Sequence, residues 1–164
     1  HLNRDFDYAG GRENQLVHWK RIGYLTGVPE AVATAPRIAD ASDARAPLDA
    51  RARAYLDVNC GHCHSATGPA ITSGLWLDAG TQDRLKLGFC KQPIAAGKGT
   101  GNRLHDIEPG NAAASIFEFR MDSADPAIMM PEVGRSVVHR EGVQLIRDWI
   151  NAQPGSCGSP AGES

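Results

Sequence analysis

The sequence lacks a long apolar run and an excess of basic residues, and each absence excludes a class of function. No stretch approaches the ~18 consecutive apolar residues of a transmembrane helix, so we expect no membrane span. The formal net charge is −2, so we expect no basic surface of the kind that binds nucleic acid. Strand-like alternation is weak throughout, so we expect a mainly α protein.

Cysteine is also scarce, with four residues among 164, but two of them belong to the most informative motif. The string Cys60-Gly61-His62-Cys63-His64 has the spacing that attaches a c-type haem. Two thiols about one helical turn apart can add across two vinyl groups of a porphyrin, and the adjacent histidine can bind the iron. The motif therefore predicts one covalent haem c, bound by Cys60 and Cys63, with His64 as the proximal ligand.

Two other interpretations of this motif stay open. A structural zinc site would usually need a second Cys-x-x-Cys pair or a His-x-x-x-His pair, and the sequence contains neither. A redox-active dithiol would be expected within a βαβ unit, which the sequence does not indicate.

The second axial position of a haem iron needs another side chain. Met130 is the first candidate, because it lies in an expected loop and Pro131 restricts the local chain direction. A thioether ligand favours Fe(II) and so raises the reduction potential. Met129 and Met121 remain alternatives. Four histidines are expected to be solvated or hydrogen-bonded instead: His18, His62, His105 and His139.

Helical spacing of apolar residues, together with the positions of glycine and proline, predicts four helices. They are expected over residues 12–22, 47–59, 111–121 and 139–152, with loops over 65–82 and 91–110.

A helix leading into Cys-x-x-Cys-His, then loops, Met-Pro and a helix ending near Trp149, resembles a class I c-type cytochrome over about residues 48–152. The resemblance implies a mainly α, class I cytochrome c fold. Its N- and C-terminal helices would cross behind the haem, with long loops and an N-terminal arm. In that fold Ala52 and Leu56 would face Trp149.

A narrower resemblance comes from strings such as Leu87-Gly88-Phe89-Cys90-Lys91 and Met129-Met130-Pro131. These are similar to haem domains at the C-termini of longer bacterial extracytoplasmic proteins. The resemblance implies a periplasmic or otherwise extracytoplasmic location, where the spare cysteines Cys90 and Cys157 should form a disulfide. We accordingly expect an N-terminal arm and linker, or the end of an upstream domain, over 1–47, a cytochrome c domain over 48–157 and a flexible tail over 158–164.

The resemblance also implies an electron carrier or relay, not an enzyme, with His64 and Met130 as axial ligands. Its partner would be a redox protein that donates or accepts electrons, or an upstream domain of the same polypeptide. One alternative is a peroxidase-like haem enzyme or a gas or redox sensor with a displaceable sixth ligand, for which His105 or His139 would supply the distal acid–base group. Another is a structural metal-binding module without haem.

Overall fold

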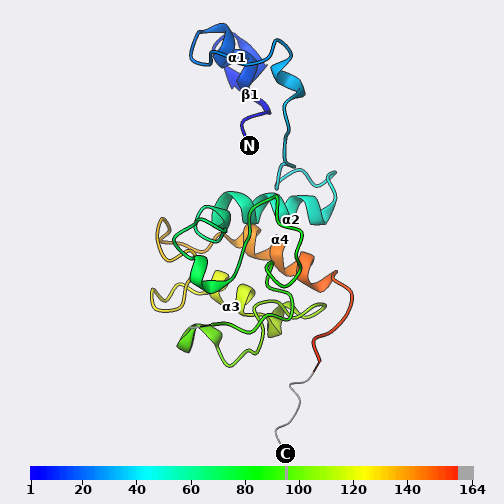
Figure 1. Ribbon diagram of the computed structural model, residues 1–164, viewed down its shortest axis with the longest axis vertical. Helices are drawn as coiled ribbons and strands as arrows, with labels where there is room; N and C mark the ends of the chain where they lie inside the picture. The colour runs from blue at the N-terminus through cyan, green and yellow to red at the C-terminus, as the bar shows by residue number, and fades with distance from the viewer. Residues whose placement is uncertain (95, 159–164) are drawn as a thin grey trace, which may run out of the picture. The chain divides into compact units, whose positions relative to one another are not determined.

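The computed structural model describes residues 1–94 and 96–158 (Figure 1). The chain divides into two compact units, His1–Ala39 and Asp40–Ser164. The division falls inside the segment 1–47 that we predicted as arm and linker. Of the predicted tail, residues 159–164 lie outside the described part of the chain.

The N-terminal unit is a β-hairpin followed by a short helix. Strands β1 (Asp5–Tyr8) and β2 (Gly11–Asn14) pair antiparallel, and α1 (Gln15–Arg21) follows directly. The Asn14 side chain caps α1 by accepting hydrogen bonds from two backbone N–H groups, those of residues 16 and 17. The sequence prediction missed the hairpin, because DFDY and GREN are short, charged and without clear apolar alternation.

Glu13 joins the hairpin to α1. Its carboxylate lies 2.9 Å from His18 Nδ1 and accepts a hydrogen bond of 2.7 Å from Arg21. The His18 ring also stacks on Tyr8, with 3.6 Å between the ring centroids. The hydrogen bonds from Arg21 and then His18 lower the pKa of Glu13 to about 2.

The described residues of the larger unit form three α-helices and several shorter helical turns. The α-helices are α2 (Leu48–Leu56), α3 (Ile116–Asp122) and α4 (Arg140–Asn151). A π-helical turn, η2 (Asp57–Gly61), continues α2. The 3-10 turns η3 (Ile71–Ser73), η4 (Gly97–Thr100) and η5 (Ala112–Ala114) lie in the long connections, and η1 (Val32–Thr34) belongs to the N-terminal unit. No helix in the described residues is long and apolar enough to cross a membrane.

Helices α2 and α4 pack against each other and form one side of the core (Figure 1). Ala52, Leu56 and Trp149 all belong to the same buried apolar cluster. Apolar residues of the connecting loops complete this cluster, among them Leu75, Leu77, Leu87, Phe89 and Ile107. The loops of the larger unit are therefore anchored by their own apolar side chains.

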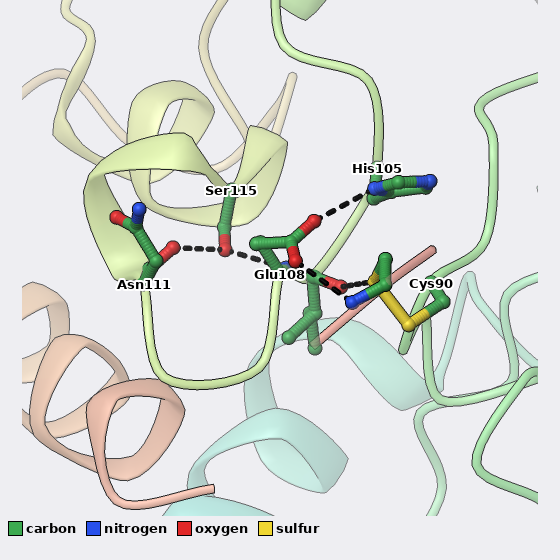
Figure 2. Close-up of a disulfide and its surroundings, with 7 residues drawn as sticks. Cys90, His105, Glu108, Asn111 and Ser115 are labelled. Carbon is green, nitrogen blue, oxygen red and sulfur yellow. Dashed lines mark hydrogen bonds and ion pairs between the residues drawn. A yellow bond between two sulfur atoms is a disulfide. The ribbon is translucent and has the colours of Figure 1, made fainter. Parts of the chain in front are cut away.

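A disulfide between Cys90 and Cys157 connects the loop after Phe89 to the segment after α4 (Figure 2). This finding is compatible with the predicted pairing. Glu108 strengthens the same connection, because its carboxylate accepts a hydrogen bond of 2.9 Å from the Cys157 backbone N–H. The other carboxylate oxygen of Glu108 lies 2.8 Å from His105 Nδ1.

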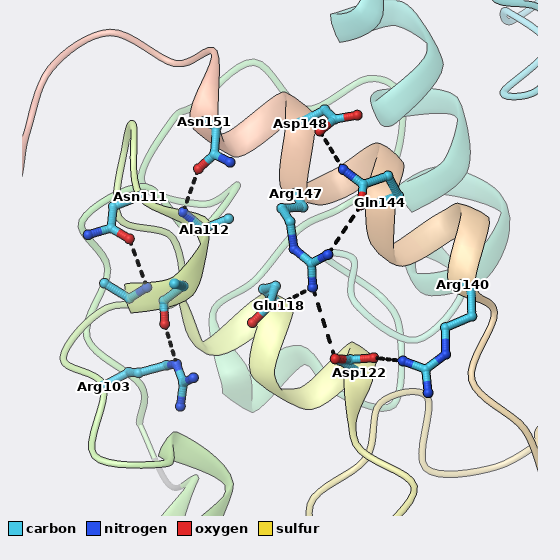
Figure 3. Close-up of polar contacts among 12 residues, drawn as sticks. Arg103, Asn111, Ala112, Glu118, Asp122, Arg140, Gln144, Arg147, Asp148 and Asn151 are labelled. Atoms are coloured by element: carbon cyan, nitrogen blue, oxygen red, sulfur yellow. Dashed lines mark hydrogen bonds and ion pairs between the residues drawn. The ribbon is translucent and has the colours of Figure 1, made fainter.

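Ion pairs join α3 to α4 on the exposed side of the unit (Figure 3). Arg147 on α4 pairs with Glu118 on α3, and Arg140 pairs with Asp122. Asn151 at the end of α4 accepts a hydrogen bond of 2.9 Å from the Ala112 backbone N–H, which fixes η5 beside the helix. Since these ion pairs are partly exposed, we expect them to orient α3 more than to stabilise it.

The prediction of a mainly α, class I cytochrome c fold is wrong. The described residues contain four α-helices, two of them only 7 residues long, and a two-stranded sheet that the prediction did not include. Most of the remaining chain forms loops and 3-10 turns, held by a disulfide and by loop residues in the core. The helices α2 and α4 do pack together, but that contact alone does not define the predicted fold.

Candidate functional site

The Cys60–His64 motif begins within the last two residues of the π-helical turn η2 (Asp57–Gly61), which continues α2. The Cys60 carbonyl accepts hydrogen bonds from the backbone N–H groups of Cys63 (3.1 Å) and His64 (2.8 Å). These bonds form the backbone turn that contains Cys60, Cys63 and His64, just after α2. Single π-helical turns within α-helices are frequent at functional sites.

The backbone after this turn is held by two further hydrogen bonds. Ala70 N–H donates to the Cys63 carbonyl at 3.0 Å, and Leu77 N–H donates to the His64 carbonyl at 2.7 Å. Both donors belong to the loop over 65–82. The loop therefore wraps around the motif and fixes the direction in which it presents its side chains.

Two glycines allow this close packing. A Cβ added to Gly61 would lie 3.2 Å from the backbone Cα of Asp78, and one added to Gly68 would collide with the Cys63 carbonyl. The middle of the motif and the turn after it thus approach backbone atoms that cannot easily move. The sequence analysis did not predict these contacts, because they join residues whose proximity depends on the fold.

Cys60 and Cys63 both carry free thiols and are partly buried. Burial, followed by the neighbouring Cys63, raises the pKa of Cys60 to about 12. Cys60 is therefore a neutral thiol near neutral pH. A structural zinc ion would instead bind the cysteine as a thiolate.

His64 presents one ring nitrogen to the loop and keeps the other available. Its Nδ1 lies 3.0 Å from Ser73 Oγ, and Ser73 Oγ donates to the Ala70 carbonyl at 2.7 Å. Burial lowers the pKa of His64, with a further lowering by the charge of Arg120. The neutral imidazole that results is the form that can bind a metal ion through Nε2.

The three candidate methionines occupy two different environments. Met121 lies on α3 and belongs to the buried apolar core. Met129 and Met130 lie half-buried in the loop after α3, where Met130 N–H donates to the Arg120 carbonyl at 3.0 Å. The peptide bond between Met130 and Pro131 is cis. Met121 is therefore part of the packed core, whereas the two loop methionines are not members of that cluster.

Several charged side chains, including one just after the loop methionines, affect the pKa of His64. The negative charge of Glu132 raises the pKa of His64, whereas the positive charge of Arg120 lowers it. Glu132 and Arg120 also form an ion pair at 3.9 Å. Lys91 also acts on His64 and forms a 3.1 Å ion pair with the buried Asp106. The charges of Glu132 and Lys91 therefore shift the pKa of His64 in opposite directions: Glu132 raises it and Lys91 lowers it.

A second group of possible metal ligands lies elsewhere in the larger unit. His105, Glu108 and Cys157 have ligand atoms within 4.8 Å of one another, and they are the only such trio among residues 1–94 and 96–158. The sulfur of Cys157 is bonded to Cys90, so it is not available as a thiolate. Cys60, Cys63 and His64 do not form a chelating trio of this kind.

A cavity of about 370 Å³ opens between α2, the loop over 79–89 and α4. Arg53 and Arg84 line it, but both side chains already have partners. Arg53 donates to two backbone carbonyls at 2.7 and 3.0 Å, and Arg84 lies 3.9 Å from the centre of the Phe89 ring. None of the predicted site residues lines this cavity.

The chemistry of the Cys60–His64 turn fits a covalent haem better than a zinc ion. It offers two free thiols and one neutral imidazole, and these three residues do not form a chelating set for a tetrahedral ion. The residue that sequence analysis missed is Ser73. Ser73 lies in the predicted loop over 65–82, but no pattern indicated that its hydroxyl contacts His64.

Comparisons with family models, curated proteins and solved structures gave no match to this chain. The resemblance to c-type cytochromes therefore stays a prediction that depends on the motif and its surroundings.

Proposed function

We propose that the chain binds one c-type haem through Cys60 and Cys63 and serves as a one-electron carrier or relay. The observation that carries this proposal is the single turn that combines two free thiols with a neutral His64 whose Nδ1 is already hydrogen-bonded. Bound haem would supply the iron that alternates between Fe(III) and Fe(II).

The residues of this chain have separate roles in the proposal. Cys60 and Cys63 attach the porphyrin, and His64 offers Nε2 as the proximal ligand. Met130 is the proposed distal ligand, with Met129 as the alternative in the same loop. What supports this assignment is the half-buried position of Met129 and Met130, together with the effect of the nearby Glu132 charge on the pKa of His64.

We further propose an extracytoplasmic location, which the disulfide supports because such bonds persist in oxidising compartments. The partner would be a redox protein or an upstream domain of the same polypeptide. A peroxidase-like function has less support, because both candidate distal histidines have other partners. His105 lies against Glu108, and His139 Nδ1 is 3.0 Å from the Tyr55 hydroxyl.

The test is to produce the chain in a bacterial periplasm that contains the machinery for c-type haem attachment. We expect the denatured protein to keep one haem mass and to show a reduced α band. The double variant Cys60→Ala/Cys63→Ala should lose both signals, whereas Cys90→Ser/Cys157→Ser should keep them. A colourless wild-type chain with the mass of its amino acids alone would disprove the proposal.

A further inference from the structure

Ser73 lies at the end of η3 and is the direct neighbour of the proximal ligand candidate. Its Oγ makes three hydrogen bonds: to the Ala70 carbonyl at 2.7 Å, to Leu75 N–H at 3.2 Å and to His64 Nδ1 at 3.0 Å. The side chain is half-buried, and all three partners come from the loop or the motif that it connects.

The directions of these hydrogen bonds follow from counting protons. A serine hydroxyl has one proton, and the Ala70 carbonyl can only accept, so that proton points to Ala70. Leu75 N–H can only donate, so Oγ accepts from it. The remaining contact, to His64, must then also be accepted by Oγ. Nδ1 therefore carries the hydrogen, and Nε2 keeps its lone pair.

The backbone holds Ser73 in position for this role. Gly74 has φ = 67°, a left-handed conformation that reverses the chain and lets Leu75 N–H reach back to Ser73. Donation to Ala70 also polarises the hydroxyl, which strengthens it as an acceptor. The serine is thus fixed before any ligand binds to His64.

We propose that Ser73 is the positioning residue of this site: it selects the tautomer of His64, orients the ring and tunes the reduction potential of the bound iron. This inference rests on the proposed function for the potential, but the tautomer is a property of the chain itself. A hydrogen bond accepted from Nδ1–H increases the basicity of the imidazole, which stabilises Fe(III) relative to Fe(II).

The first test compares reduction potentials of haem-loaded protein. Ser73→Ala should favour Fe(II) by up to about tenfold in the equilibrium constant, which corresponds to about +59 mV for one electron. Ser73→Thr keeps the hydroxyl and should stay close to the wild type. Thr72→Ala is the matched control, because it removes a hydroxyl from the same turn. Equal potentials for Ser73→Ala and Thr72→Ala would overturn the inference.

The second test needs no variant and no haem. Nitrogen-15 NMR of histidine-labelled full-length chain should show His64 with a protonated Nδ1 and an unprotonated Nε2. A protonated Nε2 in the neutral imidazole of this haem-free chain would overturn the inference, whether or not the chain can later attach haem. If the wild type attaches no haem but His64 shows the expected tautomer, the proposed function fails and the role of Ser73 in selecting the tautomer stands.

Discussion

The indole N–H of Trp149 donates a hydrogen bond of 2.7 Å to the carboxylate of Asp49. The two residues are 100 positions apart and join the last helix, α4, to the first turn of α2. Trp149 itself is 1% exposed, so its N–H has no easy alternative partner in water. The helix that leads into the cysteine motif is therefore fixed at its start by the C-terminal helix.

This contact predicts different outcomes for two substitutions of Asp49. Asp49→Asn removes the charge but keeps an acceptor, whereas Asp49→Ala removes both. Both variants lose the favourable negative charge at the start of α2. The difference between their free energies of unfolding therefore measures the hydrogen bond to Trp149. We expect Asp49→Ala to lower the free energy of unfolding by about 1–2 kcal/mol more than Asp49→Asn, measured by urea denaturation. Equal losses would show that the indole finds another partner.

Removing the disulfide should destabilise the larger unit. The bridge closes a loop with a sequence separation of 67, so the double variant Cys90→Ser/Cys157→Ser should lose about 2–4 kcal/mol of unfolding free energy. Adding a dithiol to the wild type should cause a similar loss and leave the variant unchanged. Alkylation of both cysteines in native, unreduced protein would contradict the pairing.

The N-terminal unit should respond to acid through Glu13. Its pKa is about 2 in the folded state against an ordinary 4.5, so its stabilising effect is complete above about 4.5 and is lost as the pH falls toward 2. Carboxyl NMR titration should give this lowered pKa directly. Arg21→Met should move the pKa of Glu13 back toward 4.5, since Arg21 is the largest cause of the lowering. An unchanged titration in that variant would disprove the assigned cause.

The proposed distal ligand can be tested by three alanine variants of haem-loaded protein. Met130→Ala should lower the reduction potential by at least about 0.1 V, a fraction of the roughly 0.8 V that axial ligands span. It should also let added imidazole bind to the iron. Met129→Ala should leave the potential nearly unchanged. Met121→Ala should instead reduce stability by about 2–5 kcal/mol, because this side chain belongs to the core. If the reduction potential drops only in Met129→Ala, Met129 and not Met130 is the distal ligand.

Gly68 should tolerate no side chain. A Cβ there would collide with the Cys63 carbonyl, a backbone atom that Ala70 already holds. We expect Gly68→Ala to cost about 1–3 kcal/mol of unfolding free energy and to reduce the yield of attached haem. Gly10→Ala is the control, because nothing lies within 4 Å of its added Cβ. Equal stability of the two variants would show that the loop around the motif is loose.

Local patterns in the sequence located α2 and α4 to within a few residues. The helices predicted over 12–22 and 111–121 were only partly right, since the α-helices there are Gln15–Arg21 and Ile116–Asp122. Pro47 and Asp49 marked the start of α2, and the apolar spacing after His139 marked α4, because capping and periodicity act within a few residues. The hairpin was missed for the same reason, since its strands carry no periodic apolar signal. The helix boundaries also could not reveal that loops supply much of the core.

By itself the sequence determined the chemistry that is available at one turn: two thiols and an imidazole whose spacing is set by the covalent chain. Only the tertiary structure decided what surrounds that turn. Ser73 reaches His64 and Gly68 makes room for the Cys63 carbonyl, because the loop over 65–82 is folded back against the motif. Ser73 and His64 are only nine positions apart, but the contact forms only when apolar residues of the following loop pack into the core, and no local pattern encodes that packing.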